Sequence, residues 1–288
     1  MLYRKALSAF AIMSFVIVSL VSVPALAEIR TPMTFPGRDD LIYDIIHLAL
    51  EKSNAPQSLI PSSEYYSDAR LVEEVRNGDV DLIWAGASTE LQSQLKAIKI
   101  PIFKGLSGYR TFVIERSQQK LFDNITNLEQ LKARTAGLGR FWTDTLILEA
   151  AGITVIKPVK ADSLFYMLDG HRFDYLPLGV HESQGVVDTQ QADGLNLVLE
   201  SKLLLKYPSA MYFYVEKNNQ QLYDLLNSGL EKAISDGSYD ELFYRSEIIR
   251  KTIINSNING RRVIEINNPF LPDDMPLHRE ELWLDTER

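Results

Sequence analysis

The stretch GLGRFWTDTLILEAAG, residues 137–152, joins two glycines, an arginine and two aromatic residues to the start of an apolar helical pattern. Thr143 or Asp144 can cap this helix, since Thr and Asp side chains accept hydrogen bonds from its first N–H groups. A helix N-terminus attracts anions, Trp142 offers a flat apolar wall, and Arg140 can add a charged hydrogen bond. The pattern favours a ligand-binding loop. The alternative is a tight Gly-Leu-Gly turn with Trp142 in the core.

Strand and helix patterns alternate on both sides of this stretch. A helix is predicted over residues 40–53, where apolar residues recur on one face. The apolar run DLIWAG, residues 81–86, predicts a strand buried on both faces, as in parallel sheets. The pattern restarts at residue 127, and a long and a short helix follow within residues 219–246. The expected fold class is therefore α/β with two similar halves.

The N-terminal 27 residues have the layout of a secretory signal peptide. Arg4 and Lys5 precede an apolar run, and Ala-Leu-Ala stands before Glu28. This layout predicts cleavage after Ala27 and export to the periplasm; the alternative is an uncleaved membrane anchor. The chain has no cysteine, which excludes disulfides and thiol nucleophiles, and an exported protein without disulfides fits the bacterial periplasm.

Composition and motifs argue against several functional classes. The net charge of −8 disfavours nucleic acid as a partner. The four histidines show no metal-ligand spacing, so no metal or cofactor is expected; they are His47, His171, His181 and His278. The chain contains no G-x-S-x-G elbow, and Gly-Leu-Gly-Arg lacks the third glycine and the lysine of phosphate-binding loops. These observations favour a monomeric binding protein.

The order of elements resembles that of type II periplasmic solute-binding proteins of the polar-amino-acid-binding kind. The resemblance rests on DLIWAG, on Gly-Tyr-Arg at 108–110, on residues 137–153 and on LYDLLNSGLEKAISDGSYDELF at 222–243, and it covers most of residues 28–250. It implies two α/β lobes, two crossover strands near 104–114 and 208–216, and a ligand held between the lobes. The implied division is residues 28–109 and 212–288 for the first lobe, including a C-terminal extension at 251–288, and 110–211 for the second.

The resemblance also implies which residues meet the ligand, because ligands of such lobes lie at the carboxyl ends of the strands. The expected loops are 34–38, 85–89, 139–144 and 178–182. The expected ligand-binding residues are Phe35, Trp84, Ser88, Arg110, Arg140, Trp142, Thr143, Asp144 and Glu182. An interlobe salt bridge is the alternative role for Arg110.

Two departures from the family pattern bear on the ligand. The arginine that usually follows the DLIWAG-type strand is absent from ASTELQSQLK, residues 87–96, and only Glu182 stands near the usual aspartate position. Arg110 or Arg140 is therefore expected to hold the carboxylate of a small polar ligand. A membrane importer or a sensor protein is the expected partner.

An enzyme on the same fold is the competing interpretation. A lyase resembling cyclohexadienyl dehydratase would need a general acid, and Glu182, His181 or Asp144 can supply one. The extension is expected to wrap on the surface through Phe270, Leu271, Leu282 and Trp283.

Overall fold

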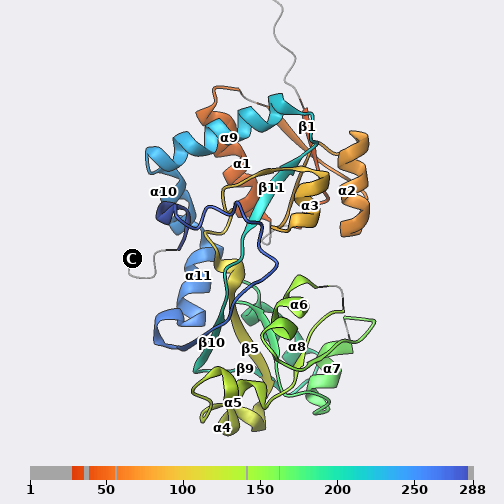
Figure 1. The fold of residues 1–288 in the computed structure, drawn as a ribbon, viewed down its shortest axis with the longest axis vertical. Coiled ribbons are helices and arrows are strands. Elements are labelled where there is room, and N and C mark those ends of the chain that lie inside the picture. The colour runs from red at the N-terminus through yellow and green to blue at the C-terminus, as the bar shows by residue number, and fades with distance from the viewer. Residues whose placement is uncertain (1–27, 36–38, 56, 141, 162, 285–288) are drawn as a thin grey trace, which may run out of the picture.

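The computed structural model describes residues 28–35, 39–55, 57–140, 142–161 and 163–284, and they form two lobes stacked along the longest axis (Figure 1). The predicted signal peptide with its cleavage site, and Phe141 of the opening stretch, lie outside the described residues. Within these ranges no helix is both long and apolar enough to cross a membrane.

The first lobe is built from the N-terminal third of the chain and a returning segment. Its elements are β1 (Glu28–Thr31), α1 (Asp40–Lys52), β2 (Ser58–Pro61), α2 (Asp68–Asn77), β3 (Leu82–Gly86), α3 (Thr89–Gln94), β4 (Lys96–Ile98), η1 (Leu106–Gly108), β11 (Met211–Val215), α9 (Gln220–Ser235) and α10 (Ser238–Arg245). The apolar face predicted for α1 packs against α9. Gly229 makes this approach possible, since a Cβ there would lie 2.0 Å from the Ala49 carbonyl oxygen.

The β3 strand is where the sequence predicts DLIWAG, but its environment differs from the prediction. β3 pairs with β11 in an antiparallel ladder, and β11 pairs with β4 in the same way. Leu82 and Ile83 are buried, whereas Trp84 is half-buried and Gly86 is exposed. Leu82 and Ile83 lie on opposite faces of β3 and pack into two different core clusters, so burial on both faces holds for this part of the strand. The comparison with parallel sheets was wrong, because an apolar run does not specify the direction of its partner strand.

The second lobe contains a mixed sheet flanked by short helices. Its elements are β5 (Tyr109–Glu115), η2 (Arg116–Gln118), α4 (Gln119–Phe122), α5 (Leu128–Lys132), β6 (Ala136–Gly137), α6 (Thr143–Ala150), β7 (Val155–Ile156), α7 (Ser163–Asp169), β8 (Leu176–Gly179), α8 (Ser183–Ala192), β9 (Leu197–Leu199) and β10 (Leu203–Lys206). β5 is central, pairing with β8, β9 and β10. β6 and β7 form a separate parallel pair.

The C-terminal extension contacts both lobes. Its elements are α11 (Glu247–Ser256), η3 (Ile258–Gly260), β12 (Arg262–Glu265) and η4 (Glu280–Leu282). β12 pairs in parallel with β10, so these residues add a strand to the sheet of the second lobe, although the sequence division assigns them to the first. The remaining boundaries of that division stay a prediction.

Each lobe has its own hydrophobic core. Phe112, Leu148 and Leu176 belong to the core of the second lobe, and Ile45 and Phe213 belong to that of the first. The segments that connect the two separately packed lobes therefore position any site between them.

Candidate functional site

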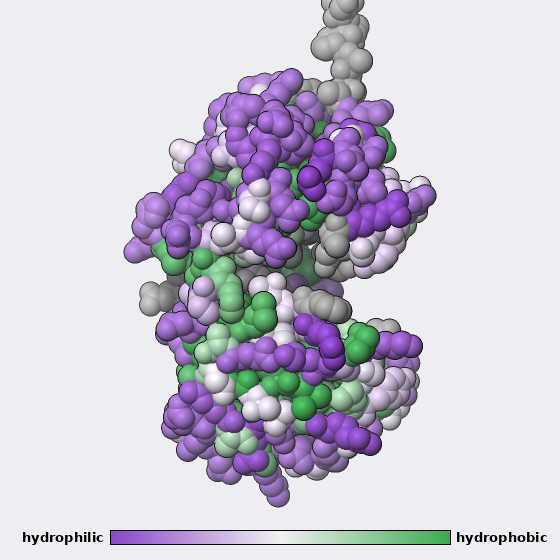
Figure 2. Space-filling model, turned by 45° about the vertical axis from the view of Figure 1, so that its right-hand side comes forward, coloured by the Kyte–Doolittle hydropathy of each residue, from purple (hydrophilic) through white to green (hydrophobic). Residues whose placement is uncertain are grey.

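The surface is hollowed between the two lobes, as the right-hand side of Figure 2 shows. One interlobe cavity of about 910 Å³ is lined by α1, α10 and α11 on one side and by α8 with the loop before it on the other. Val180 and His181, from the expected loop 178–182, contribute to its wall; the expected loops 85–89 and 139–144 do not.

The two predicted crossovers lie in direct contact. The first passes through η1 into β5, and the second leads from β10 to β11. The Tyr207 N–H donates to the Gly108 carbonyl oxygen at 3.1 Å. A Cβ on Gly108 would lie 2.0 Å from the Tyr207 carbonyl oxygen, so only glycine permits this approach. The hinge is therefore a tightly packed pair of backbone segments.

Charged side chains from three segments meet beside this hinge. Arg110, the second residue of β5, donates from Nη2 to Asp144 Oδ1 at 2.7 Å, and its Nη1 lies 3.8 Å from Glu182 Oε1. The Tyr207 hydroxyl donates to the same Asp144 oxygen. Arg110 Nε is buried and has no hydrogen-bond partner among the described residues. Both carboxylates belong to the second lobe, so these ion pairs are not the interlobe bridge that the alternative proposed.

The electrostatics of the cluster keep Arg110 charged. Burial by itself lowers the Arg110 pKa, but Asp144, Tyr207 and Glu182 outweigh it and hold that pKa above its usual value. Burial raises the pKa of the Tyr207 hydroxyl, which therefore remains a donor. The cluster thus contains one cation and two carboxylates.

His181 joins the cluster to the first lobe. Its ring stacks on Phe103 at a centroid distance of 5.5 Å and an interplanar angle of 12°. Burial lowers the His181 pKa; Arg110 adds to this effect, while Glu182 and Asp144 oppose it. Its Nδ1 atom is buried and has no partner in the described structure. The ring is therefore neutral near pH 7.

The opening stretch differs from the predicted capping pattern. Trp142 occupies the N-cap of α6 without a side-chain cap bond, so neither Thr143 nor Asp144 caps the helix. The Asp144 carboxylate instead turns to Arg110, because a charged partner is stronger than a neutral one. Thr145 Oγ1 closes the loop by donating to the Gly139 carbonyl at 2.8 Å.

Trp142 and Arg140 both reach the surface. Trp142 is 36 % exposed, so the core alternative was wrong for this residue. A Cβ on Gly139 would lie 2.6 Å from Trp142 Cε2, which explains the glycine at this position. Arg140 is exposed and donates only a long hydrogen bond, 3.4 Å, to the Lys157 carbonyl. Thr143 is also exposed.

The residues expected on the first lobe have local roles in the structure. Trp84 packs edge-on against Tyr43, with 6.2 Å between ring centroids. Ser88 caps α3 by accepting from the Leu91 N–H at 3.1 Å. Phe35 is 38 % exposed. The ligand-binding roles proposed for these side chains stay predictions.

Sequence reasoning brought together Arg110, Asp144 and Glu182 but missed Tyr207 and Phe103. Tyr207 had a usable signal, since it follows the buried strand LLLK at the second crossover. Phe103 had none, because its contact with His181 joins segments far apart in the chain. Among the described residues, no group of three or more acidic or histidine side chains is arranged to hold a metal ion.

No family model and no curated protein matches the chain. Solved structures do match. A Salmonella typhimurium periplasmic binding protein with high arginine specificity aligns at 15% identity over 75% of this chain and 97% of its own, with a TM-score of 0.52. The substrate-binding protein of an amino acid ABC transporter aligns at 14% identity, over 76% and 98%, with a TM-score of 0.51. An ancestral amino acid-binding protein, a precursor of cyclohexadienyl dehydratase, aligns at 12% identity, over 76% and 95%, with a TM-score of 0.52.

The chain has the two-lobed type II periplasmic-binding-protein fold. At identities this low, the matches show a shared fold and nothing about function. They confirm the fold class expected from the sequence. The alignments include almost the whole of each neighbour, whereas about a quarter of this chain lies outside them.

Proposed function

We propose that this protein captures a small polar ligand between its lobes and delivers it to a membrane importer or a sensor protein. The observation that carries the proposal is the cluster of Arg110, Asp144, Glu182 and Tyr207 at the hinge. Buried polar atoms are rarely left unpaired, and both Arg110 Nε and His181 Nδ1 lack a partner among the described residues. A ligand in the cleft would supply these missing contacts.

The charges of the cluster suit a ligand that carries a carboxylate and a cationic group. The carboxylate would accept from Arg110, with Arg140 and the start of α6 as further contacts. The cationic group would face Asp144 and Glu182, whose two negative charges exceed the single charge of Arg110. Neighbours that bind arginine or amino acids support this ligand class.

Ligand capture would proceed by hinge closure. The crossovers at Gly108 and Tyr207 connect the lobes, and a ligand that contacts both lobes stabilises the closed state over the open one. Phe35, Trp84 and Ser88 would complete the contacts from the first lobe. Export through the predicted signal peptide would place the protein in the periplasm, as for the periplasmic neighbour.

A thermal-shift screen of amino acids and related zwitterions on residues 28–288 tests the proposal, because a ligand that binds only the native state raises the melting temperature. We expect Arg110→Gln to weaken binding of the best hit about 10- to 100-fold, since a charged hydrogen bond contributes about 1.5–3 kcal/mol. Arg116→Gln, at the exposed residue that follows β5, is the matched control. Equal affinity of the two variants would refute the role of Arg110.

A lyase is the second candidate function, and one observation favours it. One structural neighbour is described as a precursor of cyclohexadienyl dehydratase. The lowered pKa of His181 leaves a neutral imidazole beside Glu182, and such a pair can move a proton. Product formation from the bound compound, followed by NMR, would decide for the enzyme; retention of unchanged ligand would decide for the binding protein.

A further inference from the structure

The C-terminal extension crosses between the lobes twice more, in addition to the two hinge segments. α11 leaves the first lobe, β12 joins the sheet of the second, and the chain then returns to the first lobe at Met275 and Leu282. In Figure 1 this segment runs in dark blue in front of the hinge. The two lobes are therefore connected by four segments of chain.

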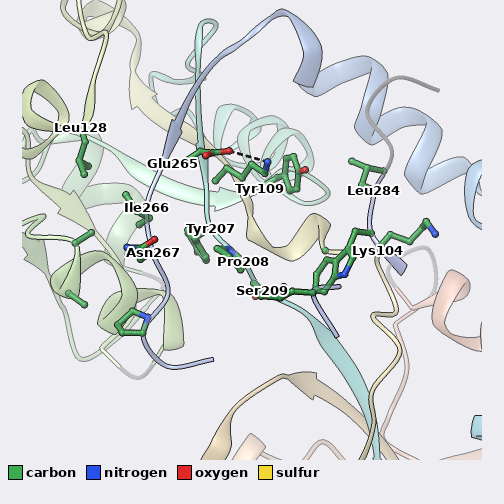
Figure 3. A pocket seen from close by; sticks show the side chains of 17 residues that line it. Lys104, Tyr109, Leu128, Tyr207, Pro208, Ser209, Glu265, Ile266, Asn267 and Leu284 are labelled. Carbon is green, nitrogen blue, oxygen red and sulfur yellow. Dashed lines mark hydrogen bonds and ion pairs between the residues drawn. The ribbon is translucent and has the colours of Figure 1, made fainter. Parts of the chain in front are cut away.

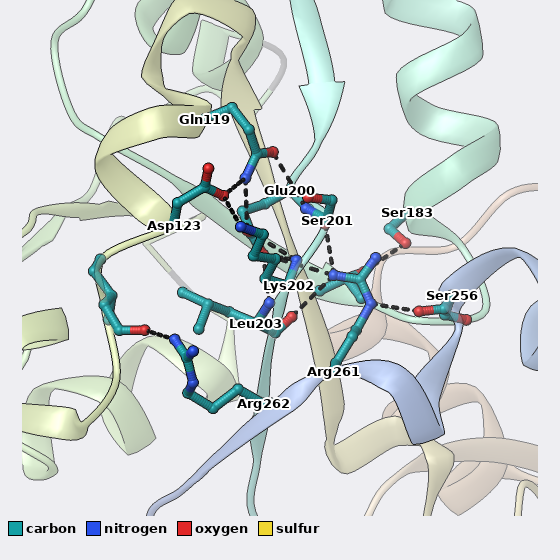
Figure 4. A network of polar contacts seen from close by, with 12 residues as sticks. Gln119, Asp123, Ser183, Glu200, Ser201, Lys202, Leu203, Ser256, Arg261 and Arg262 are labelled. Carbon is teal, nitrogen blue, oxygen red and sulfur yellow. Dashed lines mark hydrogen bonds and ion pairs between the residues drawn. The ribbon is translucent and has the colours of Figure 1, made fainter.

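The anchor on the second lobe is a buried polar network (Figure 4). Arg261 Nη1 donates to the carbonyl oxygens of Glu200 and Leu203 and lies 3.6 Å from the Glu200 carboxylate. The side chains of Arg261 and Glu200 are 4% and 0% exposed. Ile264, within the ladder with β10, and Ile266, just after it, pack into the core of the second lobe. Detaching this anchor would remove the only cation within ion-pair distance of the buried Glu200 carboxylate among the described residues. The carboxylate would keep its hydrogen bonds from Gln119 and from the N–H groups of Lys202 and Leu203.

The anchor on the first lobe combines an ion pair with aromatic packing. Arg279 donates to both carboxylate oxygens of Glu231 in α9, at 2.7 and 2.9 Å. The Trp283 ring lies against Gly105, where a Cβ would be 2.6 Å from the ring, and the Leu284 N–H donates to the Lys104 carbonyl at 2.8 Å. Leu282 is buried, as the sequence predicts. Phe270, which the sequence also suggests as an anchor, is 40 % exposed.

The segment between the anchors is short and lies along the hinge. It comprises residues 267–270, because Leu271 already packs against the first lobe. Asn268 Nδ2 donates to the Pro208 carbonyl in the second crossover at 2.9 Å. A cavity of about 790 Å³ separates the extension from the hinge strands, with Tyr109, Tyr207 and Trp283 in its wall (Figure 3). Residues from both lobes line this cavity, so its shape must change when the lobes rotate.

We propose that residues 261–284 form an interlobe strap that restricts the rotation of the lobes. Each anchor moves with its own lobe, and the four residues 267–270 between the anchors span at most about 14 Å when fully extended. Rotation must therefore bend or stretch the strap, or detach an anchor. The strap narrows the range of open states from which a ligand is captured.

Cutting the strap without removing it tests the proposal. A specific protease site inserted between Pro269 and Phe270, both exposed, allows cleavage while both anchors stay in place. Because the chain has no cysteine, Asn77→Cys in the first lobe and Lys120→Cys in the second take spin labels uniquely. Electron-spin distance measurements on the ligand-free protein then report the interlobe distance. We expect cleavage to widen the distance distribution relative to the uncut insertion variant.

The matched control carries the same protease site between Asp193 and Gly194, an exposed turn after α8 that crosses no lobe boundary. Cleavage there should leave the distribution unchanged. An unchanged distribution after cleavage at 269–270 would overturn the proposal, as would loss of the C-terminal fragment in size-exclusion chromatography. No ligand is used, so the outcome is independent of the proposed function.

Discussion

Arg110 in β5 and Arg261 just before β12 are both largely buried arginines beside a carboxylate, but their partners differ in kind. Arg261 donates to the backbone carbonyls of Ser256, Glu200 and Leu203, which cannot move without unfolding the local chain. Arg110 has side-chain partners, and its Nε has none in the described structure. Side chains can rearrange when a ligand arrives, whereas a backbone cage cannot. The comparison separates a structural arginine from one available for binding.

The pKa values of the two arginines also shift in opposite directions. Burial lowers the Arg261 pKa, and Glu200 offsets only part of that effect. At Arg110 the surrounding carboxylates more than offset burial. The two carboxylates beside the single charge of Arg110 leave room for a cationic group, which fits the ligand class proposed above.

The largest expected effect is on stability, at Arg261. Arg261→Ala should lower the free energy of unfolding by about 3–5 kcal/mol, because it removes the charge beside the buried Glu200 carboxylate and the hydrogen bonds to three backbone carbonyls. Arg110→Gln should cost less, since the side chains of Asp144 and Glu182 are 23% and 46% exposed and can be hydrated. Urea unfolding followed by far-ultraviolet dichroism measures both. Equal losses for the two variants would remove the distinction between them.

The next effect is on binding, at the opening stretch. Trp142→Ala should weaken binding at least about tenfold, because truncating an aromatic side chain that the bound ligand buries costs about 2 kcal/mol or more. Arg140→Ala should do the same by removing a charged hydrogen bond worth about 1.5–3 kcal/mol. Titration calorimetry with the ligand from the thermal-shift screen measures the affinities. Tyr166→Ala, an exposed aromatic on α7 of the same lobe, is the control.

Two outcomes would change the interpretation of this stretch. Wild-type affinity in both variants would leave the loop as a turn and shift the ligand contacts to Phe35, Trp84 and Ser88. Unfolding of Trp142→Ala would show that the ring supports the second lobe despite its exposure.

The smallest effect is a pH dependence that arises at His181. The unfolded state protonates this ring with a pKa of about 6.5, while burial lowers its pKa in the folded state. Stability should therefore fall as the pH decreases below about 6.5, by no more than about 1.4 kcal/mol per pH unit. Glu182 and Asp144 oppose the shift and Arg110 adds to it. His181→Gln should remove this contribution between pH 7.5 and 5.5, and an identical slope in the variant would contradict the assignment.

The sequence by itself determined the elements and their order. The apolar period over residues 40–53 is α1, the DLIWAG run is β3, and the restart after residue 127 belongs to the second lobe. These features are local, because helix periodicity and strand composition depend on neighbours within a few residues. The burial of Leu282 was also readable, since an apolar side chain in a charged tail must find a surface to cover.

Only the tertiary structure decided the partners. Asp144 was a reasonable helix cap by its local position, but Arg110, 34 residues away, binds its carboxylate. β12 was assigned to the first lobe and pairs instead with β10 in the second. His181 meets Phe103 across the lobe boundary. Such pairings depend on which segments the fold brings together, and the short polar or apolar stretches involved are compatible with several partners until the two cores have packed.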